Sequence, residues 1–344
     1  MQQSSKPKIL LIYTGGTIGM VKDFKTGVLK AFNFTKLLES IPELNLLDCQ
    51  IETISFDKPI DSSNMNPSRW IELADIIEKQ YDSCDGFVIL HGSDTMSYSA
   101  SALSFMLENL NKPVVFTGSQ LPIGDLRTDA KENLITAIQI ASLKQKGKPI
   151  FTEVCLYFEY KLYRGNRTSK INAEHFNAFA SPNFPPLAES GVHLKVNKEL
   201  IQAKRNSKPL IVHRKLETNV MVLKLFPGMN QSVLSAVLQI PNLRGLIIET
   251  YGSGNAPTEA WFIDALESAI KKGLPIVNVT QCSGGSVQMG NYETSTHLKE
   301  IGVISGKDLT TEAAVTKLMY LLGEGVSIPV FRTIYETGLR GELS

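Results

Sequence analysis

The sequence has few residues that would support a metal centre, a disulfide framework or a membrane span. Its four cysteines, Cys49, Cys84, Cys155 and Cys282, lie far apart in a chain of 344 residues, so their spacing predicts neither a zinc site nor disulfide pairs. No apolar run approaches the roughly 18 residues that cross a bilayer. Polar residues 1–8 lead directly into a strand pattern, and we therefore expect no secretory signal. These absences favour a cytoplasmic protein that needs no metal or other cofactor.

An excess of charge of one sign is also missing. The formal net charge is +1, from 35 basic and 34 acidic residues, which gives no electrostatic reason to expect nucleic acid or an acidic membrane as a partner. The length is sufficient for two domains, each with its own hydrophobic core.

Short apolar runs that end in small polar residues are the main pattern in the first half of the chain. Phe87–Leu90 is such a run, and a helical pattern begins a few residues after it. Strands that alternate with helices predict a parallel α/β sheet, in which ligands bind at the carboxyl ends of the strands. We expect four polar turns to converge there on one pocket: Thr14–Thr17, Asp61–Ser63, His91–Thr95 and Gly118–Gln120.

The turn after the first strand offers two hydroxyl groups between glycines. Such a turn could cradle a phosphate, as in dinucleotide-binding folds, but residues 19–30 lack the helical periodicity that this requires and are typical of a loop or hairpin. Thr14 and Thr17 lie beside unobstructed backbone N–H groups, which suits a nucleophile next to an oxyanion site. In the turn after Phe87–Leu90, Ser93 or Asp94 could simply cap the following helix. Three polar side chains in succession after a glycine favour a functional turn.

The strand and helix patterns divide into two runs. Residues 197–217 are polar and show no clear periodicity, and a second alternation of strands and helices follows them. We predict an N-terminal domain over residues 1–196, a linker over 197–217 and a smaller C-terminal α/β domain over 218–344. The basic and polar composition of Leu162–Lys170 is typical of a solvated loop. The last helical pattern that we detect in the chain is Thr311–Leu322.

Two motifs together resemble the paired signatures of the bacterial-type L-asparaginase family. They are Thr14-Gly15-Gly16-Thr17-Ile18 and His91-Gly92-Ser93-Asp94-Thr95, and the similarity extends over nearly the whole chain to the type I, cytoplasmic branch of the asparaginase/glutaminase family. The resemblance implies a two-domain α/β fold with a larger N-terminal, mostly parallel sheet flanked by helices. It also implies a homodimer or homotetramer in which a neighbouring subunit completes the site.

The same resemblance implies hydrolysis of L-asparagine to L-aspartate and ammonia. Thr14 would form a β-aspartyl ester, assisted by Ser93, Asp94 and Lys170, with Lys170 as the base. An amide is a poor electrophile and an alcohol a weak nucleophile, so this chemistry requires both a base and an oxyanion site. The implied substrate-binding residues are Asp61, Ser62, Ser63, Ser93, Asp94, Ser119 and Asn255.

Three positions depart from the family pattern. Ser93 stands where the family usually has threonine, so the hydroxyl is kept without the methyl group that restricts χ1, and we expect activity with a less constrained hydroxyl. No tyrosine occurs between Met20 and Lys30, where the family often has one, so the group that assists Thr14 is left open. Glu249 stands where some type I enzymes have an arginine of an allosteric asparagine site. Because a carboxylate repels the carboxylate of the effector, we expect weak or absent allostery.

Two other interpretations remain. One is the amidase subunit that supplies ammonia for tRNA-dependent amidation, although that subunit normally carries an extra N-terminal domain and only seven residues precede Lys8. The other is a binding or sensing protein, which would bind aspartate without releasing ammonia. Side activity on glutamine is also open, because one methylene changes discrimination by only ~1–3 kcal/mol.

Overall fold

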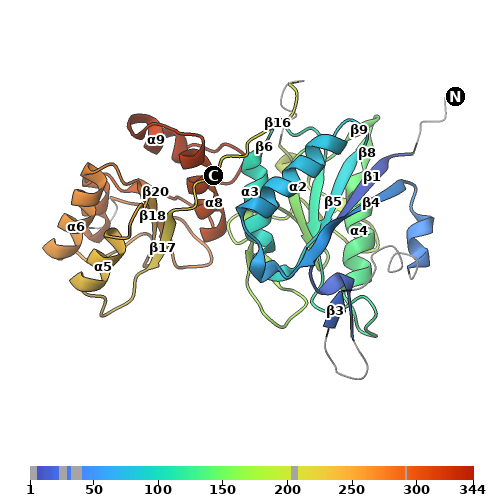
Figure 1. Ribbon diagram of the computed structural model, residues 1–344, viewed down its shortest axis with the longest axis horizontal. Helices are drawn as coiled ribbons and strands as arrows, with labels where there is room; N and C mark the ends of the chain where they lie inside the picture. Colours follow the sequence, from blue (N-terminus) through green and yellow to red (C-terminus); the bar gives the residue numbers. More distant parts are fainter. Residues whose placement is uncertain (1–5, 23–28, 32–40, 203–207, 291–292) are drawn as a thin grey trace. The chain divides into compact units, whose positions relative to one another are not determined.

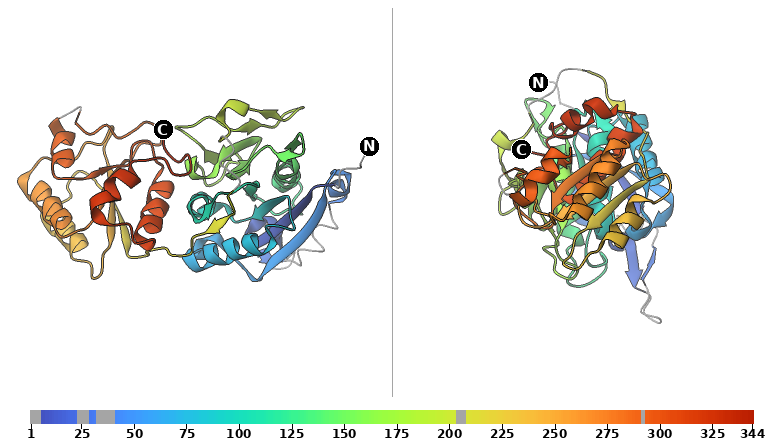
Figure 2. Two further views of the ribbon diagram at one scale, coloured as in Figure 1. Left: turned by 90° about the horizontal axis from the view of Figure 1, so that it is seen from above. Right: turned by 90° about the vertical axis from the view of Figure 1, so that its left-hand side faces the viewer.

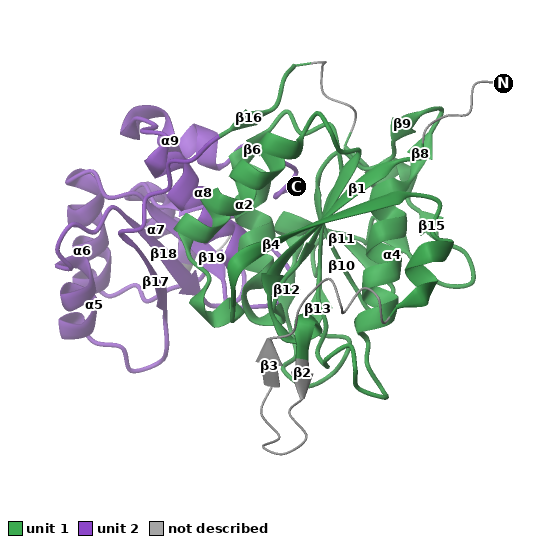
Figure 3. Ribbon diagram, turned by 45° about the vertical axis from the view of Figure 1, so that its right-hand side comes forward, with its two compact units in different colours: residues 1–212 green, residues 213–344 purple. Residues whose placement is uncertain are grey.

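The computed structural model describes residues 6–22, 29–31, 41–202, 208–290 and 293–344 of the chain (Figure 1). The chain divides into two compact units, residues 1–212 and 213–344, which Figure 3 colours green and purple. Each unit has its own sheet, and the larger sheet belongs to the first unit. This architecture confirms the predicted two-domain α/β fold. The dividing point lies inside residues 197–217, and the boundaries at 196 and 218 stay a prediction.

A mixed, mostly parallel sheet of eight strands forms the centre of the first unit as far as it is described, in the order β15-β14-β11-β10-β7-β5-β1-β4. Its central strands are buried on both faces, which is why their sequences are continuous apolar runs. The parallel strands are β10 (Val154–Phe158), β7 (Val114–Thr117), β5 (Gly86–Leu90), β1 (Lys8–Gly15) and β4 (Gln50–Ile60). The antiparallel strands are β11 (Lys161–Arg164), β14 (Ala188–Glu189) and β15 (Lys195–Val196).

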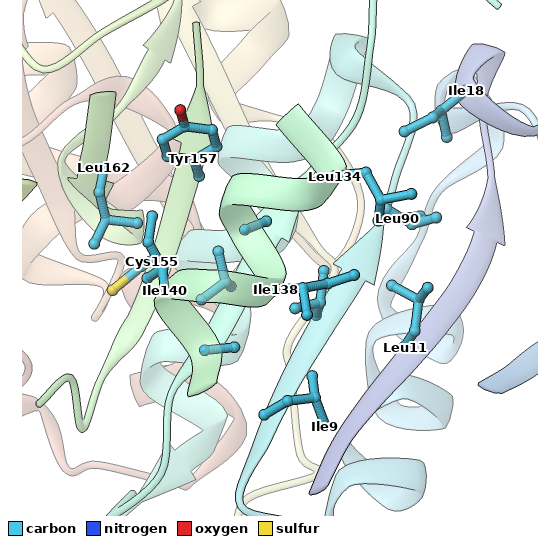
Figure 4. Close-up of a cluster of buried hydrophobic side chains, with 14 of the residues drawn as sticks. Ile9, Leu11, Ile18, Leu90, Leu134, Ile138, Ile140, Cys155, Tyr157 and Leu162 are labelled. Atoms are coloured by element: carbon cyan, nitrogen blue, oxygen red, sulfur yellow. The ribbon is translucent and has the colours of Figure 1, made fainter. Parts of the chain in front are cut away.

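Helices cover both faces of this sheet. Helix α4 (Ala130–Ser142) lies on one face, and α2 (Pro67–Gln80) and α3 (Met96–Met106) lie on the other (Figures 1 and 2). On the α4 face, Leu134 and Ile138 pack in one hydrophobic cluster with Ile9 and Leu11 of β1 and with Leu90 of β5 (Figure 4). Each fully buried side chain of this size contributes about 1.5–3 kcal/mol, so this cluster holds β1 and β5 firmly in place.

Short strand pairs and 3-10 helices complete the first unit. Strand β2 pairs with β3 across residues 23–28, which agrees with the hairpin, one of the two predicted alternatives for residues 19–30. The pairs are β2 (Met20–Lys22) with β3 (Leu29–Ala31), β6 (Leu107–Glu108) with β16 (Ile211–Val212), β8 (Lys144–Gln145) with β9 (Lys148–Pro149), and β12 (Ser169–Lys170) with β13 (Phe179–Ala180). The 3-10 helices are η1 (Thr17–Gly19), η2 (Pro42–Leu46), η3 (Ser62–Asn64), η4 (Ser93–Thr95), η5 (Gly165–Arg167) and η6 (Lys198–Leu200).

The segment Leu162–Lys170 is largely buried, so the prediction of a solvated loop is wrong. Arg164 is only 5% exposed, and its Nε donates to Glu153 Oε2 at 2.6 Å. Arg167 is 2% exposed, and both guanidinium groups lie over the ring of Phe184. A carboxylate and an aromatic ring that are distant in sequence replace water around these cations. The segment is therefore anchored at both ends of η5, three residues before Lys170.

A parallel four-stranded sheet, in the order β17-β18-β19-β20, organises the described part of the second unit. Leu234, Phe262 and Leu298, from three successive helices, share a core with Leu246 and Ile276 of the sheet. The strands are β17 (Val220–Lys224), β18 (Gly245–Thr250), β19 (Ile276–Thr280) and β20 (Ile304–Ser305). The helices are α5 (Gln231–Leu238), α6 (Ala260–Lys271), α7 (Glu293–Glu300), α8 (Thr311–Gly323) and α9 (Ile328–Tyr335).

The predicted helix Thr311–Leu322 is confirmed as α8, but α9 follows it, so the prediction that it is the final helix is wrong. Helix α9 is only eight residues long and has a proline in its first turn. A proline is compatible with the first turn because the first N–H groups of a helix have no intrahelical acceptor. Such a short segment gives little periodicity to detect.

A fully buried ion pair connects α8 to residues 339–342. Lys317 Nζ lies 2.5 Å from Glu342 Oε1, and both side chains have 0% exposure. The ammonium group also donates to Thr337 O at 2.7 Å. Glu342 accepts backbone N–H bonds from Leu339 at 3.0 Å and from Arg340 at 2.7 Å. Removing one partner of such a pair typically costs about 3–5 kcal/mol, because the other charge stays buried and unpaired.

The carboxyl ends of β1, β4 and β5 approach one another closely, and glycines make this approach possible. Gly15 of β1 lies opposite Ile60 of β4. Gly16 has φ +85°, and a Cβ atom there would lie 2.5 Å from the backbone nitrogen of Gly92. A Cβ atom on Gly92 would lie 2.5 Å from Ser62 Oγ. Three of the four predicted polar turns are therefore brought together at one edge of the sheet, as expected.

We expect Gly16→Ala to lower the free energy of unfolding by roughly 1–3 kcal/mol, because it adds both a strained φ and a steric overlap. The measurement is unfolding in urea. Gly124→Ala is the control, since a Cβ atom there meets nothing within 4 Å. An equal effect of the two substitutions would contradict the close approach of these turns.

Candidate active site

Ser93, Asp94 and Lys170 meet in a hydrogen-bonded cluster after the carboxyl end of β5. Lys170 Nζ donates to Asp94 Oδ1 at 2.7 Å and to Ser93 Oγ at 2.9 Å. The lysine side chain is 17% exposed, whereas that of Asp94 is 64% exposed. The ammonium group is thus held between a carboxylate and a hydroxyl at an accessible edge. Strand β12 supplies the lysine and η4 supplies its two partners.

Thr14 lies at the end of β1, next to β5. Its hydroxyl donates to the carbonyl oxygen of Leu90 at 2.9 Å, and the residue is 1% exposed. A hydroxyl has a single proton, so this hydrogen bond directs the proton of Thr14 to the main chain of β5. Attack by the oxygen on a substrate would require that proton to be transferred to a base.

Asp61, Ser62 and Ser63 form the turn after β4. Asp61 Oδ1 accepts the backbone N–H of Ser63 at 2.9 Å and its hydroxyl at 2.8 Å. These bonds, chiefly the backbone one, hold the pKa of Asp61 below its usual value, so the exposed carboxylate is ionised at neutral pH. The carbonyl of the buried Ser62 accepts from the hydroxyl of Thr95 at 2.7 Å. This bond links the turn after β4 to the turn after β5.

The fourth polar turn contains the predicted Ser119 and also Gln120, which was not among the predicted site residues. Ser119 is 2% exposed, and its hydroxyl donates to Leu121 O at 2.6 Å, within its own turn. The next residue, Gln120, accepts the hydroxyl proton of Ser93 on its Oε1 at 2.9 Å. Its position at the end of the fourth polar turn was the signal that could have identified it.

Asn255 and Glu249 lie in the second unit. Asn255 is in a tight turn after β18, where its N–H donates to Tyr251 O at 2.8 Å. A role in binding substrate stays a prediction. Glu249 Oε1 accepts the hydroxyl of Thr311 at 2.6 Å, and Oε2 lies 3.6 Å from Lys224 Nζ. The side chain of Glu249 is 14% exposed, so its carboxylate is largely buried as well as paired with these two groups.

His91 forms a buried hydrogen-bond network next to the turn that carries Ser93, and no pattern in the sequence predicted a role for it. Its Nδ1 lies 2.7 Å from Gly92 O, and its Nε2 lies 2.8 Å from the hydroxyl of Ser99. Trp70 Nε1 donates to the same hydroxyl at 2.9 Å. All of these hydrogen bonds can form when the imidazole is neutral: Nδ1–H donates to the carbonyl oxygen of Gly92, and Nε2 accepts the hydroxyl proton of Ser99. Burial lowers the pKa of His91 to about 4, in keeping with this neutral form.

The loop that lacks a tyrosine includes residues 23–28, which lie outside the described residues, so the group that assists Thr14 stays open. Within the described ranges, no three His, Cys, Asp or Glu side chains come close enough to hold a metal ion. No helix in the same ranges is long and apolar enough to span a membrane.

Comparison with protein families decides the relationship. A family model described as "Asparaginase, N-terminal" matches residues 8–202, and one described as "Glutaminase/Asparaginase C-terminal domain" matches residues 219–335. The chain belongs to the asparaginase family. The resemblance predicted from two motifs is thus confirmed over most of the sequence.

The relatives of this chain include L-asparaginases and a subunit of a tRNA-dependent amidotransferase. L-asparaginase 1 of Escherichia coli K12 is 43% identical over 340 residues, which cover 98% of each chain. The solved structure of L-asparaginase I from Vibrio cholerae has a TM-score of 0.90 and 40% identity, covering 98% of this chain and 99% of that one. A glutamyl-tRNA(Gln) amidotransferase component of Methanobrevibacter smithii is 33% identical over 349 residues, which cover 99% of this chain and 78% of the relative. The similarity to the first two proteins supports placing this chain in the type I branch of the family.

We expect His91 to make the protein less stable as the pH falls from 7 to 5. Its pKa is about 6.5 in an unfolded chain and about 4 in the folded one, so between these values the unfolded state binds the proton. The free energy of unfolding then decreases on acidification, by on the order of 2 kcal/mol over this range.

The measurement is urea unfolding of wild type and His91→Asn at pH 7 and pH 5. The substitution should remove this part of the pH dependence, whereas His193→Asn, at an exposed position, should keep it. An unchanged pH dependence in His91→Asn would show that His91 is not the buried neutral group described above.

Proposed function

We propose that this chain hydrolyses L-asparagine to L-aspartate and ammonia through a covalent ester on Thr14. The observation that carries the proposal is the cluster in which Lys170 contacts Ser93 and Asp94, at the sheet edge where Thr14 lies near the end of β1. The 43% identity to L-asparaginase 1 of E. coli supports the choice of asparagine as substrate.

In the first half-reaction, Thr14 Oγ attacks the carbon of the side-chain amide. A C–O bond forms, the C–N bond breaks, and the nitrogen leaves as ammonia. The proton lost by Thr14 is the one that the leaving nitrogen gains. We assign its transfer to Lys170, which accepts a proton when its amine is neutral and donates one when it is charged. Asp94 and Ser93 orient the amine through the two hydrogen bonds described above.

In the second half-reaction, water attacks the carbonyl carbon of the ester. A new C–O bond forms, and the bond to Thr14 Oγ breaks. One proton of the water returns to Thr14, again by way of Lys170, and the remaining hydroxyl becomes part of the side-chain carboxyl of aspartate. The enzyme is restored and the sum is asparagine plus water giving aspartate plus ammonia.

The remaining polar groups suit the two charged ends of the substrate. The exposed carboxylates of Asp61 and Asp94 are complementary to its α-ammonium group. Hydroxyl and N–H groups of Ser62, Ser63 and Ser119 are complementary to its α-carboxylate. We further propose that Asn255 contributes to binding within a cytoplasmic homodimer or homotetramer whose subunits share the site. No metal or other cofactor takes part in the proposed chemistry.

Two alternatives differ in what they do with free amino acids. An amidotransferase component, suggested by the 33% identical relative, would work on behalf of a tRNA-bound substrate. A sensor would bind aspartate without turnover. The higher identity to an L-asparaginase favours hydrolysis of the free amino acid.

We expect Thr14→Ala to lower ammonia release from L-asparagine by about 10³-fold or more, because the nucleophile is removed. The assay measures ammonia from L-asparagine and L-glutamine with wild type, with Thr14→Ala and with Thr53→Ala as a control at an exposed position of β4. Turnover that survives in Thr14→Ala would exclude the threonine ester. A wild type that binds aspartate and releases no ammonia would instead favour a sensor.

The dependence of the rate on asparagine concentration should be hyperbolic. Glu249 would place a negative charge where an activating asparagine would need a partner for its own carboxylate. Initial rates over a wide range of asparagine concentration provide the measurement. A sigmoidal curve would contradict the expected weakness of allostery.

A further inference from the structure

The hydroxyl of Ser93 has two partners, and they fix the direction of its proton. Lys170 Nζ donates to Ser93 Oγ at 2.9 Å, and Ser93 Oγ donates to Gln120 Oε1 at 2.9 Å. Because a hydroxyl has one proton and two lone pairs, its proton points to Gln120 and a lone pair faces the ammonium group. Ser93 therefore meets Lys170 as an acceptor.

The side-chain amide of Gln120 is itself oriented by its neighbours. Its Nε2 donates to Ala173 O at 3.1 Å and to His175 O at 3.2 Å. A reversed amide would bring its oxygen against two carbonyl oxygens, which cannot donate a hydrogen bond. The orientation that satisfies both carbonyls is the one that directs Oε1 to Ser93. Gln120 thus connects the turn after β7 with the segment that follows Lys170.

A buried carboxylate holds the main chain of Gln120. The N–H of Gln120 donates to Asp129 Oδ2 at 2.9 Å, and the N–H of Leu121 donates to Oδ1 at 3.1 Å. Asp129 is 6% exposed, and Asn133 of α4 donates to it at 3.3 Å and to Gly118 O at 3.0 Å. The turn is therefore anchored to α4, so the amide of Gln120 starts from a fixed backbone.

Ser93 depends on its hydrogen bonds with Lys170 and Gln120 because a serine side chain is not fixed in one rotamer by its own shape. A threonine side chain is restricted at χ1 by its methyl group, whereas serine can occupy all three staggered positions. At position 93 the two hydrogen bonds supply the restriction that the missing methyl group would have provided.

We propose that Gln120 is a positioning residue for the amide hydrolysis. It holds Ser93 in one rotamer and keeps its proton away from Lys170, so that a lone pair of Ser93 orients the amine. This inference rests on the proposed function. A purely structural role, in which Gln120 only joins the turn to residues 173 and 175, would affect folding but not the dependence on the residue at position 93.

The kinetic test is Gln120→Met, which keeps the length of the side chain without the amide. The kcat for asparagine should fall, by up to about 100-fold, as expected when a reacting group is misplaced by about 1 Å. The KM should change by less than about threefold, since Gln120 is proposed to act through Ser93. Gln139→Met, at an exposed position of α4, is the matched control and should leave both constants unchanged.

The decisive comparison repeats Gln120→Met in a Ser93→Thr background. The methyl group of threonine should restore the restriction on χ1, so the loss of kcat there should shrink to less than about threefold. An equal loss in the serine and threonine backgrounds, or a change in KM alone, would overturn the proposal. Gln120→Asn, which is one methylene shorter and keeps the amide, serves as a second variant in case Gln120→Met does not fold.

A second measurement does not depend on activity. Melting temperatures are compared for Ser93→Ala, Gln120→Met and the double variant. If the two side chains are bonded, the double variant should lose less than the sum of the two single losses, and strict additivity would overturn the proposal. A wild type without asparaginase activity would disprove the proposed function, while this comparison would still decide whether Gln120 holds Ser93.

Discussion

The close approach of main chain at the ends of β1, β4 and β5 is the constraint on which the candidate site depends. Gly15, Gly16 and Gly92 have no Cβ atom, and atoms of a neighbouring strand end or turn lie where each Cβ atom would stand. Thr14, Ser62 and Ser93 are consequently adjacent to backbone that cannot move independently. A site assembled in this way obtains its precision from buried strands and not from long loops, which are harder to fix in position.

The fold could be predicted because short segments of the sequence specify its strands, turns and helices. Strands such as Phe87–Leu90 are continuous apolar runs, and each is followed by a polar turn and a helical pattern, which together specify a parallel sheet. What escaped prediction depends on distant contacts. The burial of Arg164 requires Glu153 and Phe184, and the short helix Ile328–Tyr335 is stabilised by packing, with too few residues to show a period.

The site could be predicted only in part, for the same reason. The polar turns pointed to Ser93 and Asp94, but spacing in the sequence gave no reason to select Lys170, which came from the family resemblance. His91 and Gln120 have roles that depend on partners in other elements, Ser99 and Ser93 respectively. A hydrogen bond between side chains of different elements leaves no period and no local motif, so it becomes visible only in three dimensions.

The ion pair between Lys317 and Glu342 has a consequence for the order in which the second unit forms. The lysine and its carboxylate are separated by 25 residues, so α8 can form as a helix before residues 339–342 have reached their folded position. A buried ammonium group without its partner is strongly unfavourable. Helix α8 must therefore keep Lys317 in water until residues 339–342 fold over it. Docking of this helix and burial of the carboxylate are then one cooperative step in the folding of the second unit.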